Sequence, residues 1–134
     1  MWKFSTLIAD DDAAMRGVLK AILPEIGAEV VDEAADGQEA LGKYVKHRPH
    51  LVLLDVNMPK MSGIEALRQI RIINPKACII MLTSESSVET VRECIRSGAR
   101  AYVLKTNPPE TIAQGIADGW SGYVDQMTGV QKQY

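Results

Sequence analysis

The sequence has few cysteines, no excess of basic residues and no long hydrophobic run. Lys and Arg number 15 against 17 Asp and Glu, so the net charge of −2 provides no positive field for nucleic acid or an anionic membrane. No apolar stretch approaches the roughly 18 residues of a membrane-spanning helix. The N-terminus turns acidic too early for a signal peptide. We therefore expect no direct binding to nucleic acid or membrane.

The two cysteines, Cys78 and Cys94, are well separated, and each lies among apolar residues. This context favours buried free thiols over a disulfide or a metal-binding pair. Together with the lack of a signal peptide, it predicts a reducing, cytoplasmic location.

What the sequence does contain is a regular alternation of two kinds of segment. Hydrophobic residues make up 46% of the 134 residues and charged residues 24%, which suits one globular domain with a real core. Short, almost continuously apolar runs are typical of parallel strands covered on both faces. These runs span residues 5–10, 28–33, 50–55, 77–82 and 101–105.

Helix signals follow each run. Asp36 and Ser62 are expected to cap the second and third helices, Gly98 to end the fourth, and prolines to open the fifth. Five strand–helix pairs predict an α/β, flavodoxin-like doubly wound (βα)5 fold with a five-stranded parallel sheet in the order 2-1-3-4-5. The apolar face expected for the fourth helix consists of Val88, Val91 and Ile95.

Polar residues stand at the carboxyl ends of four predicted strands, where open parallel sheets form their sites. Three carboxylates crowded there would repel one another unless a divalent cation neutralised them. Oxygen ligands open to water favour Mg²⁺. A lysine and a hydroxyl group beside them suit the oxygens of a phosphoryl group in transfer to a carboxylate. The residues expected to converge are Asp10, Asp11, Asp55, Thr83 and Lys105.

The order and spacing of four segments resemble those of the CheY-like receiver domain of two-component response regulators. The segments read LIADDD, LLDVNMPKMSG, IIMLTSE and GARAYVLK, and the resemblance covers residue 5 to about 120. It implies a receiver domain over residues 1–120. It also implies that Asp55 is the phospho-acceptor. Asp10 and Asp11 would then hold Mg²⁺ together with Asp55 and the backbone carbonyl of Asn57.

The same resemblance implies a signalling switch that assists its own phosphorylation and dephosphorylation. Asp55 would take the phosphoryl group from a sensor histidine kinase or a phosphotransfer protein, and Lys105 would pair with the phosphate. Thr83 would bond the phosphoryl group, Tyr102 would turn inward, and the surface of the fourth helix, fifth strand and fifth helix would change for a downstream protein target. A monomer or a phosphorylation-dependent homodimer is expected.

The residues after the lysine depart from the family pattern. Members usually have proline there, often after a cis peptide, whereas Thr106 and Asn107 follow Lys105. A cis bond before a non-proline residue costs roughly 2.5–4 kcal/mol. We therefore expect either a trans bond with Lys105 slightly displaced or a strained cis bond.

Two positions are expected to set the lifetime of the phosphate. In the family, the residues two beyond the phospho-acceptor and two beyond the threonine flank the path of attacking water. Asn57 and Glu85 hold these positions, a polar pair that resembles that of the chemotaxis members of the family. This implies a short-lived acyl phosphate.

Residues 121–134 form a segment after the predicted domain that is too short for an output domain. Gly122 and Gly129 oppose a helix there by about 1 kcal/mol each, so we favour a frayed tail or a linker remnant. The alternative is an extension of the fifth helix, since apolar residues recur with a 3-4-3-4 spacing. These residues are Trp120, Tyr123, Met127, Val130 and Tyr134.

Two other functions belong to related folds. A haloacid dehalogenase-type phosphatase also uses an aspartate nucleophile and Mg²⁺, but its Asp-x-Asp-x-Thr motif would need threonine where Ala14 stands. A flavodoxin-like cofactor-binding module would need a loop rich in Gly, Ser or Thr after the first strand. Three consecutive aspartates there would repel a phosphate. Both functions remain alternatives to the switch.

Overall fold

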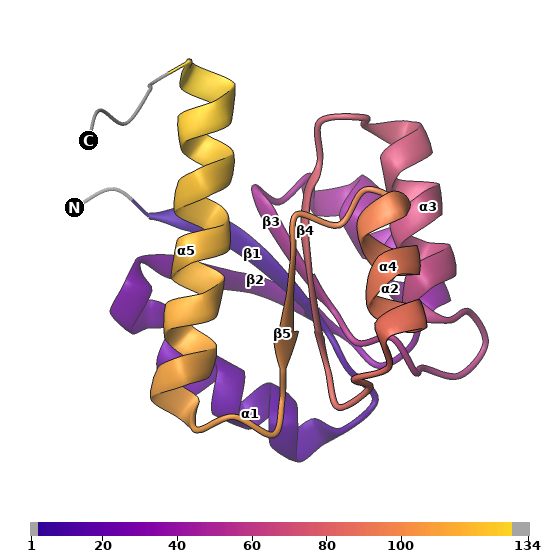
Figure 1. Ribbon diagram of the computed structural model, residues 1–134, viewed down its shortest axis with the longest axis horizontal. Helices are drawn as coiled ribbons and strands as arrows, with labels where there is room; N and C mark the ends of the chain where they lie inside the picture. The colour runs from indigo at the N-terminus through magenta and orange to yellow at the C-terminus, as the bar shows by residue number, and fades with distance from the viewer. Residues whose placement is uncertain (1–2, 130–134) are drawn as a thin grey trace.

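The computed structural model describes residues 3–129 and places one parallel sheet between two layers of helices (Figure 1). The strand order β2-β1-β3-β4-β5 confirms the predicted flavodoxin-like winding. The strands are β1 (Phe4–Ala9), β2 (Ala28–Ala34), β3 (Leu51–Leu54), β4 (Cys78–Thr83) and β5 (Ala101–Leu104). The helices are α1 (Ala13–Ile22), the short 3-10 helix η1 (Leu23–Ile26), α2 (Gly37–His47), α3 (Gly63–Ile73), α4 (Val88–Arg96) and α5 (Pro109–Thr128).

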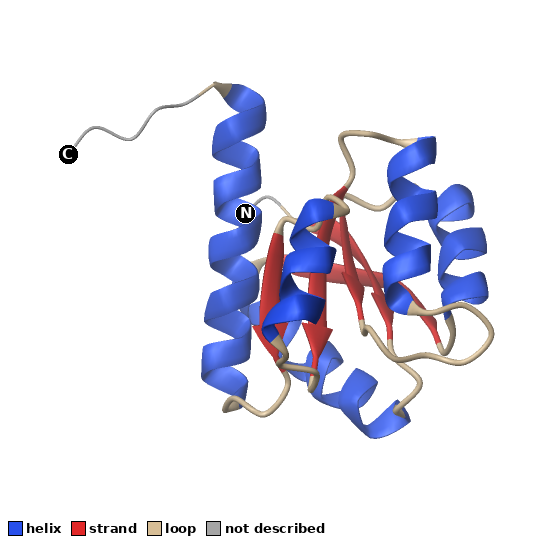
Figure 2. Ribbon diagram, turned by 45° about the vertical axis from the view of Figure 1, so that its right-hand side comes forward, coloured by secondary structure: helices blue, strands red, loops and turns tan. Residues whose placement is uncertain are grey.

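The sheet separates two hydrophobic cores. Helices α1 and α5 cover one face, and α2, α3 and α4 cover the other (Figures 1 and 2). Because successive strand residues point to opposite faces, Leu53 packs in the core under α1 and α5 while Leu54 packs under the other three helices. All four residues of β3 are buried. This explains why the central strands read as continuous apolar runs rather than alternating ones.

Side-chain caps determine where the helices begin. Asp36 accepts a hydrogen bond from the backbone N–H of Glu39, and Ser62 accepts one from that of Glu65, as predicted. Gly98 follows the C-cap of α4 with φ of 106°, a left-handed conformation that glycine adopts without strain. These signals are local, so the sequence alone was sufficient to identify them.

The last helix differs from the expectation we favoured. α5 continues through Gly122 to Thr128, which is the helical alternative for this part of residues 121–134. Val130 and Tyr134 lie outside the described residues. A Cβ on Gly122 would lie 2.9 Å from Nη2 of Arg100. The absence of a side chain at Gly122 therefore leaves space for the guanidinium group of Arg100. This packing offsets part of the free-energy cost of a glycine within a helix.

Aromatic contacts also hold the extended part of α5 in place. The ring of Trp120 stacks on Phe4 of β1 with 4.4 Å between centroids and on Tyr123 with 5.5 Å. The Tyr123 hydroxyl donates to the backbone carbonyl of Lys76, 2.7 Å away. These contacts join α5 to the first strand and to the loop before β4, so tertiary packing stabilises a segment whose composition does not favour a helix.

The buried face of α4 also differs from the predicted one. Val88 is 66% exposed and Ile95 is 48% exposed, whereas Cys94 is fully buried. α4 packs against α3 and against β5, which is an edge strand. Other elements therefore cover only a narrow strip of the α4 surface. Val88 and Ile95, two of the three residues expected in the core, face solvent.

The expectation for the two cysteines agrees with the structure. Cys78 and Cys94 are both buried and free. Within residues 3–129, no helix has the length and apolar character needed to cross a membrane.

Candidate functional site

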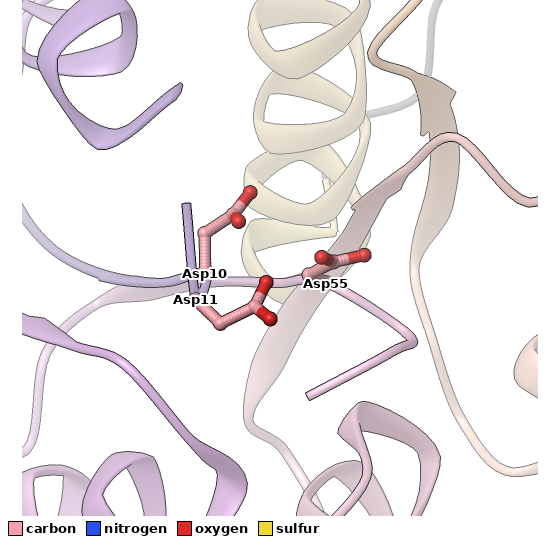
Figure 3. A group of neighbouring side chains, drawn as sticks. All are labelled: Asp10, Asp11 and Asp55. Carbon is pink, nitrogen blue, oxygen red and sulfur yellow. The ribbon is translucent and has the colours of Figure 1, made fainter. Parts of the chain in front are cut away.

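The carboxyl ends of β1 and β3 bring three aspartates together (Figure 3). One carboxylate oxygen from each of Asp10, Asp11 and Asp55 lies within 4.8 Å of the other two. Asp10 and Asp55 are 2% and 5% exposed, whereas Asp11 is exposed to solvent. The cluster is therefore buried on one side and open on the other.

Backbone hydrogen bonds of the sheet place two of these aspartates. The Asp10 N–H donates to the carbonyl of Ala34 in β2, and the Asp55 N–H donates to the carbonyl of Ala9 in β1. Asp10 and Asp55 are thus fixed directly beyond the last residues of their strands. The buried sheet determines the separation of their carboxylates.

Lys105, directly after β5, supplies a positive charge to the cluster. Its Nζ lies 2.6 Å from Oδ2 of Asp10 and 2.9 Å from Oδ2 of Asp55. Burial alone would lower the pKa of Lys105, but hydrogen bonds and attraction from Asp10 and Asp55 outweigh it and raise the pKa above its ordinary value. The ammonium group therefore stays charged at neutral pH.

Both carboxylate oxygens of Asp10 have a partner. Its Oδ1 accepts the backbone N–H of Asp12 at 2.9 Å. Its Oδ2 is buried and forms the 2.6 Å ion pair with Lys105. Burial raises the pKa of Asp10, although Lys105 and the Asp12 amide oppose the rise. One lysine among three carboxylates leaves negative charge that a cation could neutralise.

Thr83 and Tyr102 both bond to the backbone of Glu85. The Thr83 hydroxyl, fully buried at the end of β4, accepts the Glu85 N–H at 3.2 Å. The Tyr102 hydroxyl donates to the Glu85 carbonyl. Burial raises the pKa of Tyr102 to about 12, so its hydroxyl keeps its proton at neutral pH. The two residues are therefore connected through a single residue of the loop after β4.

The peptide bond after Lys105 is trans, since residues 3–129 contain no cis peptide bond. The Lys105–Thr106 bond therefore has the trans form named in the first of the two expected alternatives. The Asn107 N–H donates to the carbonyl of Leu104 at 3.2 Å and closes a turn directly after β5. Lys105 still reaches Asp10 and Asp55, so a proline after it is not required for that contact.

Two residues that support the cluster were missed by the sequence analysis. The Gly63 N–H donates to the carbonyl of Val56 at 2.8 Å, and a Cβ on Gly63 would lie 1.8 Å from the carbonyl oxygen of Asp55. Arg16 donates from Nη1 to the backbone carbonyl of Asp10 at 2.6 Å. The sequence offered one clue to Gly63, its position directly after the Ser62 cap. No sequence feature indicated a role for Arg16.

The chain matches known proteins over most of its length. A family model described as "Response regulator receiver domain" matches residues 6–117. The chemotaxis protein CheY of Thermotoga maritima is 38% identical over 110 residues, which cover 82% of this chain and 92% of that protein.

Solved structures agree with this match. The CheX–CheY–BeF3–Mg complex from Borrelia burgdorferi gives a TM-score of 0.83 at 32% identity, covering 87% of this chain and 89% of that one. A CheY-like receiver domain protein from Methanospirillum hungatei also gives 0.83, at 30% identity, covering 94% and 99%. With the family model, these similarities identify the chain as a member of the response regulator receiver domain family of two-component signalling.

Proposed function

We propose that this receiver domain is a switch in which Asp55 accepts a phosphoryl group from a phosphohistidine of a sensor histidine kinase or phosphotransfer protein. The observation that carries the proposal is the position of the Lys105 ammonium between the carboxylates of Asp10 and Asp55. A carboxylate oxygen of Asp55 attacks phosphorus, an O–P bond forms as the N–P bond breaks, and the imidazole leaves with the electron pair of that bond.

The donor set of the acidic cluster fits Mg²⁺. Asp10, Asp11 and Asp55 supply carboxylate oxygens, and the backbone carbonyl of Asn57 is the fourth proposed ligand. The excess of negative charge, three clustered carboxylates against the single ammonium group of Lys105, supports this assignment. When bound, Mg²⁺ neutralises charge on the carboxylates and on the phosphoryl oxygens. The similar CheY of Borrelia burgdorferi occurs in a complex with BeF3 and Mg²⁺.

The switch itself depends on groups of this chain. Lys105 pairs with an oxygen of the new phosphoryl group, and the Thr83 hydroxyl turns toward another. Thr83 then gives up the N–H of Glu85, whose carbonyl holds the Tyr102 hydroxyl. Tyr102 changes position, and so does the surface formed by α4, β5 and α5. A downstream protein target reads this surface, on which Val88 and Ile95 already expose apolar groups.

The remaining parts of the proposal concern the setting of the protein. We place the protein in the cytoplasm. Two-component phosphotransfer occurs there, and the reducing conditions keep cysteines such as Cys78 and Cys94 in the free thiol form. It acts as a monomer or as a phosphorylation-dependent homodimer, without direct contact with nucleic acid or membrane.

The two alternative functions have less support. The side chain of Asp12 accepts the backbone N–H of Ala14 and caps α1, so it does not join Asp10 as the paired aspartates of a haloacid dehalogenase would require. Where a flavodoxin-like module would bind phosphate, after β1, the chain presents Asp10 and Asp11. Neither arrangement favours a function other than the switch.

Substitution of Asp55 with asparagine tests the proposal. Incubation with a small acyl phosphate and Mg²⁺ is expected to add one phosphoryl group to the wild-type protein and none to Asp55→Asn, because an amide is not a nucleophile. Intact-mass analysis measures the outcome. Asp118→Asn, which changes an exposed aspartate of α5, is the matched control and should be labelled like the wild type. Equal labelling of Asp55→Asn would show that the acceptor lies elsewhere.

Alanine at Asn57 or at Glu85 is expected to prolong the life of the phosphorylated state by about tenfold, the effect of losing one hydrogen bond of about 1.4 kcal/mol to the attacking water. Asn57 is exposed and Glu85 is partly buried, so both side chains are accessible to water. Loss of the phosphoryl group is followed by mass after removal of the donor. An unchanged rate in both variants would contradict the proposed role.

A further inference from the structure

A second polar cleft lies at the end of the molecule opposite the aspartates. It has a volume of about 310 Å³ and lies between the extended part of α5 and the loops that enter β4 and β5. Figure 2 shows α5 continuing past the amino ends of the strands on this side. The cleft is lined by Arg71 of α3, Lys76, Arg100, and Tyr123 and Gln126 of α5, among others.

The cleft concentrates positive charge. Its lining includes Arg71, Lys76 and Arg100 but no carboxylate. Within residues 3–129, none of these three cations forms an ion pair. The two guanidinium groups instead donate to neutral oxygens, Arg71 to the carbonyl of Ala77 at 3.3 Å and Arg100 to the side chain of Gln126. On a chain with a net charge of −2, this cleft is a local site of attraction for anions.

A cavity with an aromatic lining adjoins the cationic cleft. It has a volume of about 210 Å³, and Ala77 and Tyr123 line both spaces. Tyr44 and Trp120 also line it, and Trp120 stacks on Tyr123. Because Trp120 already stacks on Phe4 and Tyr123, a planar ring in this cavity would pack against the edges of these aromatic side chains. Guanidinium groups match the oxygens of phosphate.

We propose that the two adjoining spaces form a binding site for a nucleotide. Its phosphate groups would contact Arg71, Lys76 and Arg100, and its base would lie in the cavity lined by Trp120 and Tyr123. The combined volume falls in the range of about 300–1,000 Å³ of small-molecule sites. The family match ends at residue 117, before the α5 residues that form one wall. The site is separate from Asp55 and does not depend on phosphorylation there.

Tryptophan fluorescence tests the proposal with ATP as the probe. The chain has two tryptophans, so Trp2→Phe leaves Trp120 as the only reporter. Titration with ATP in EDTA, which removes divalent cations from the aspartate cluster, is expected to change the Trp120 emission. In the same background, Arg100→Gln and Lys76→Gln are each expected to weaken ATP binding at least about tenfold. Arg92→Gln, an exposed arginine of α4 outside the cleft, is the matched control and should bind like the parent.

Pyrophosphate and adenosine serve as the two half-ligands. Each is expected to bind more weakly than ATP, because each fills one of the two spaces. Lack of ATP binding, or unchanged affinity in both glutamine variants, would overturn the proposal. Pyrophosphate that binds as tightly as ATP without a change in Trp120 emission would also overturn it, because the aromatic cavity would then take no part. The exposed Lys76 allows this test even if Arg100→Gln disturbs the contact with Gln126.

Discussion

Replacement of Lys105 with methionine is expected to lower the free energy of unfolding by about 3 kcal/mol in buffer without Mg²⁺. The substitution keeps an unbranched side chain, one heavy atom shorter, and removes the cation that contacts the buried carboxylates of Asp10 and Asp55. Two unpaired carboxylates then remain in a largely dry environment, which is costlier than the loss of a surface ion pair. Urea denaturation in EDTA measures the difference.

Addition of Mg²⁺ distinguishes the charge effect from a packing effect. The cation should stabilise Lys105→Met more than the wild type, because it replaces the lost positive charge beside Asp10 and Asp55. Lys46→Met, at an exposed position of α2, is the control and should change stability little. Wild-type stability of Lys105→Met in EDTA would show that the two ion pairs contribute nothing to folding.

The Gly63→Ala variant is expected to lose about 3 kcal/mol of stability, at the upper end of the cost of overpacking, and to accept little phosphate. The added Cβ would lie 1.8 Å from the carbonyl oxygen of Asp55 and 2.7 Å from its carbonyl carbon. Both atoms belong to the backbone, so the clash cannot be relieved by rotation of a side chain. The loop that carries Asp55 must move. Thermal unfolding and acyl-phosphate labelling measure the two effects.

Gly42→Ala is the matched control for this substitution. Gly42 lies inside α2, and a Cβ there would meet no atom within 4 Å. Alanine should therefore stabilise the protein by about 0.5–1 kcal/mol through its higher helix propensity. Similar losses in the two variants would mean that the close approach of Gly63 to Asp55 is not the cause.

The strand order and the aspartate cluster could be predicted because both depend on strong local signals. The run before Asp55 is continuously apolar, which is the pattern of a strand covered on both faces. Once the strands are parallel, the residues after them meet at one edge. Asp10, Asp55 and Lys105 could therefore be placed together before any coordinates were known.

The end of α5 and the buried face of α4 were predicted wrongly, because both depend on contacts between residues that are distant in the sequence. Helix propensity at Gly122 argues for an end of the helix, but the guanidinium of Arg100 occupies the space that glycine leaves. Periodicity in α4 favours burial of Val88 and Ile95, but the helix lies beside an edge strand and buries Cys94 instead. No pattern within either segment contains this information. Arg16 is a different case, because its partner is the carbonyl of the nearby Asp10, and a main-chain carbonyl carries no mark in the sequence.

The shared attachment of Thr83 and Tyr102 has a consequence for how such a protein can diversify. Both hydroxyls bond to main-chain atoms of residue 85, and neither bond uses its carboxylate. If Glu85 acts on the attacking water as proposed, substitutions of its side chain would change the lifetime of the phosphorylated state while both main-chain hydrogen bonds stay in place. Under the proposed function, signal duration would depend on the side chain of residue 85 and signal transmission on its main chain, so the two would be separable traits.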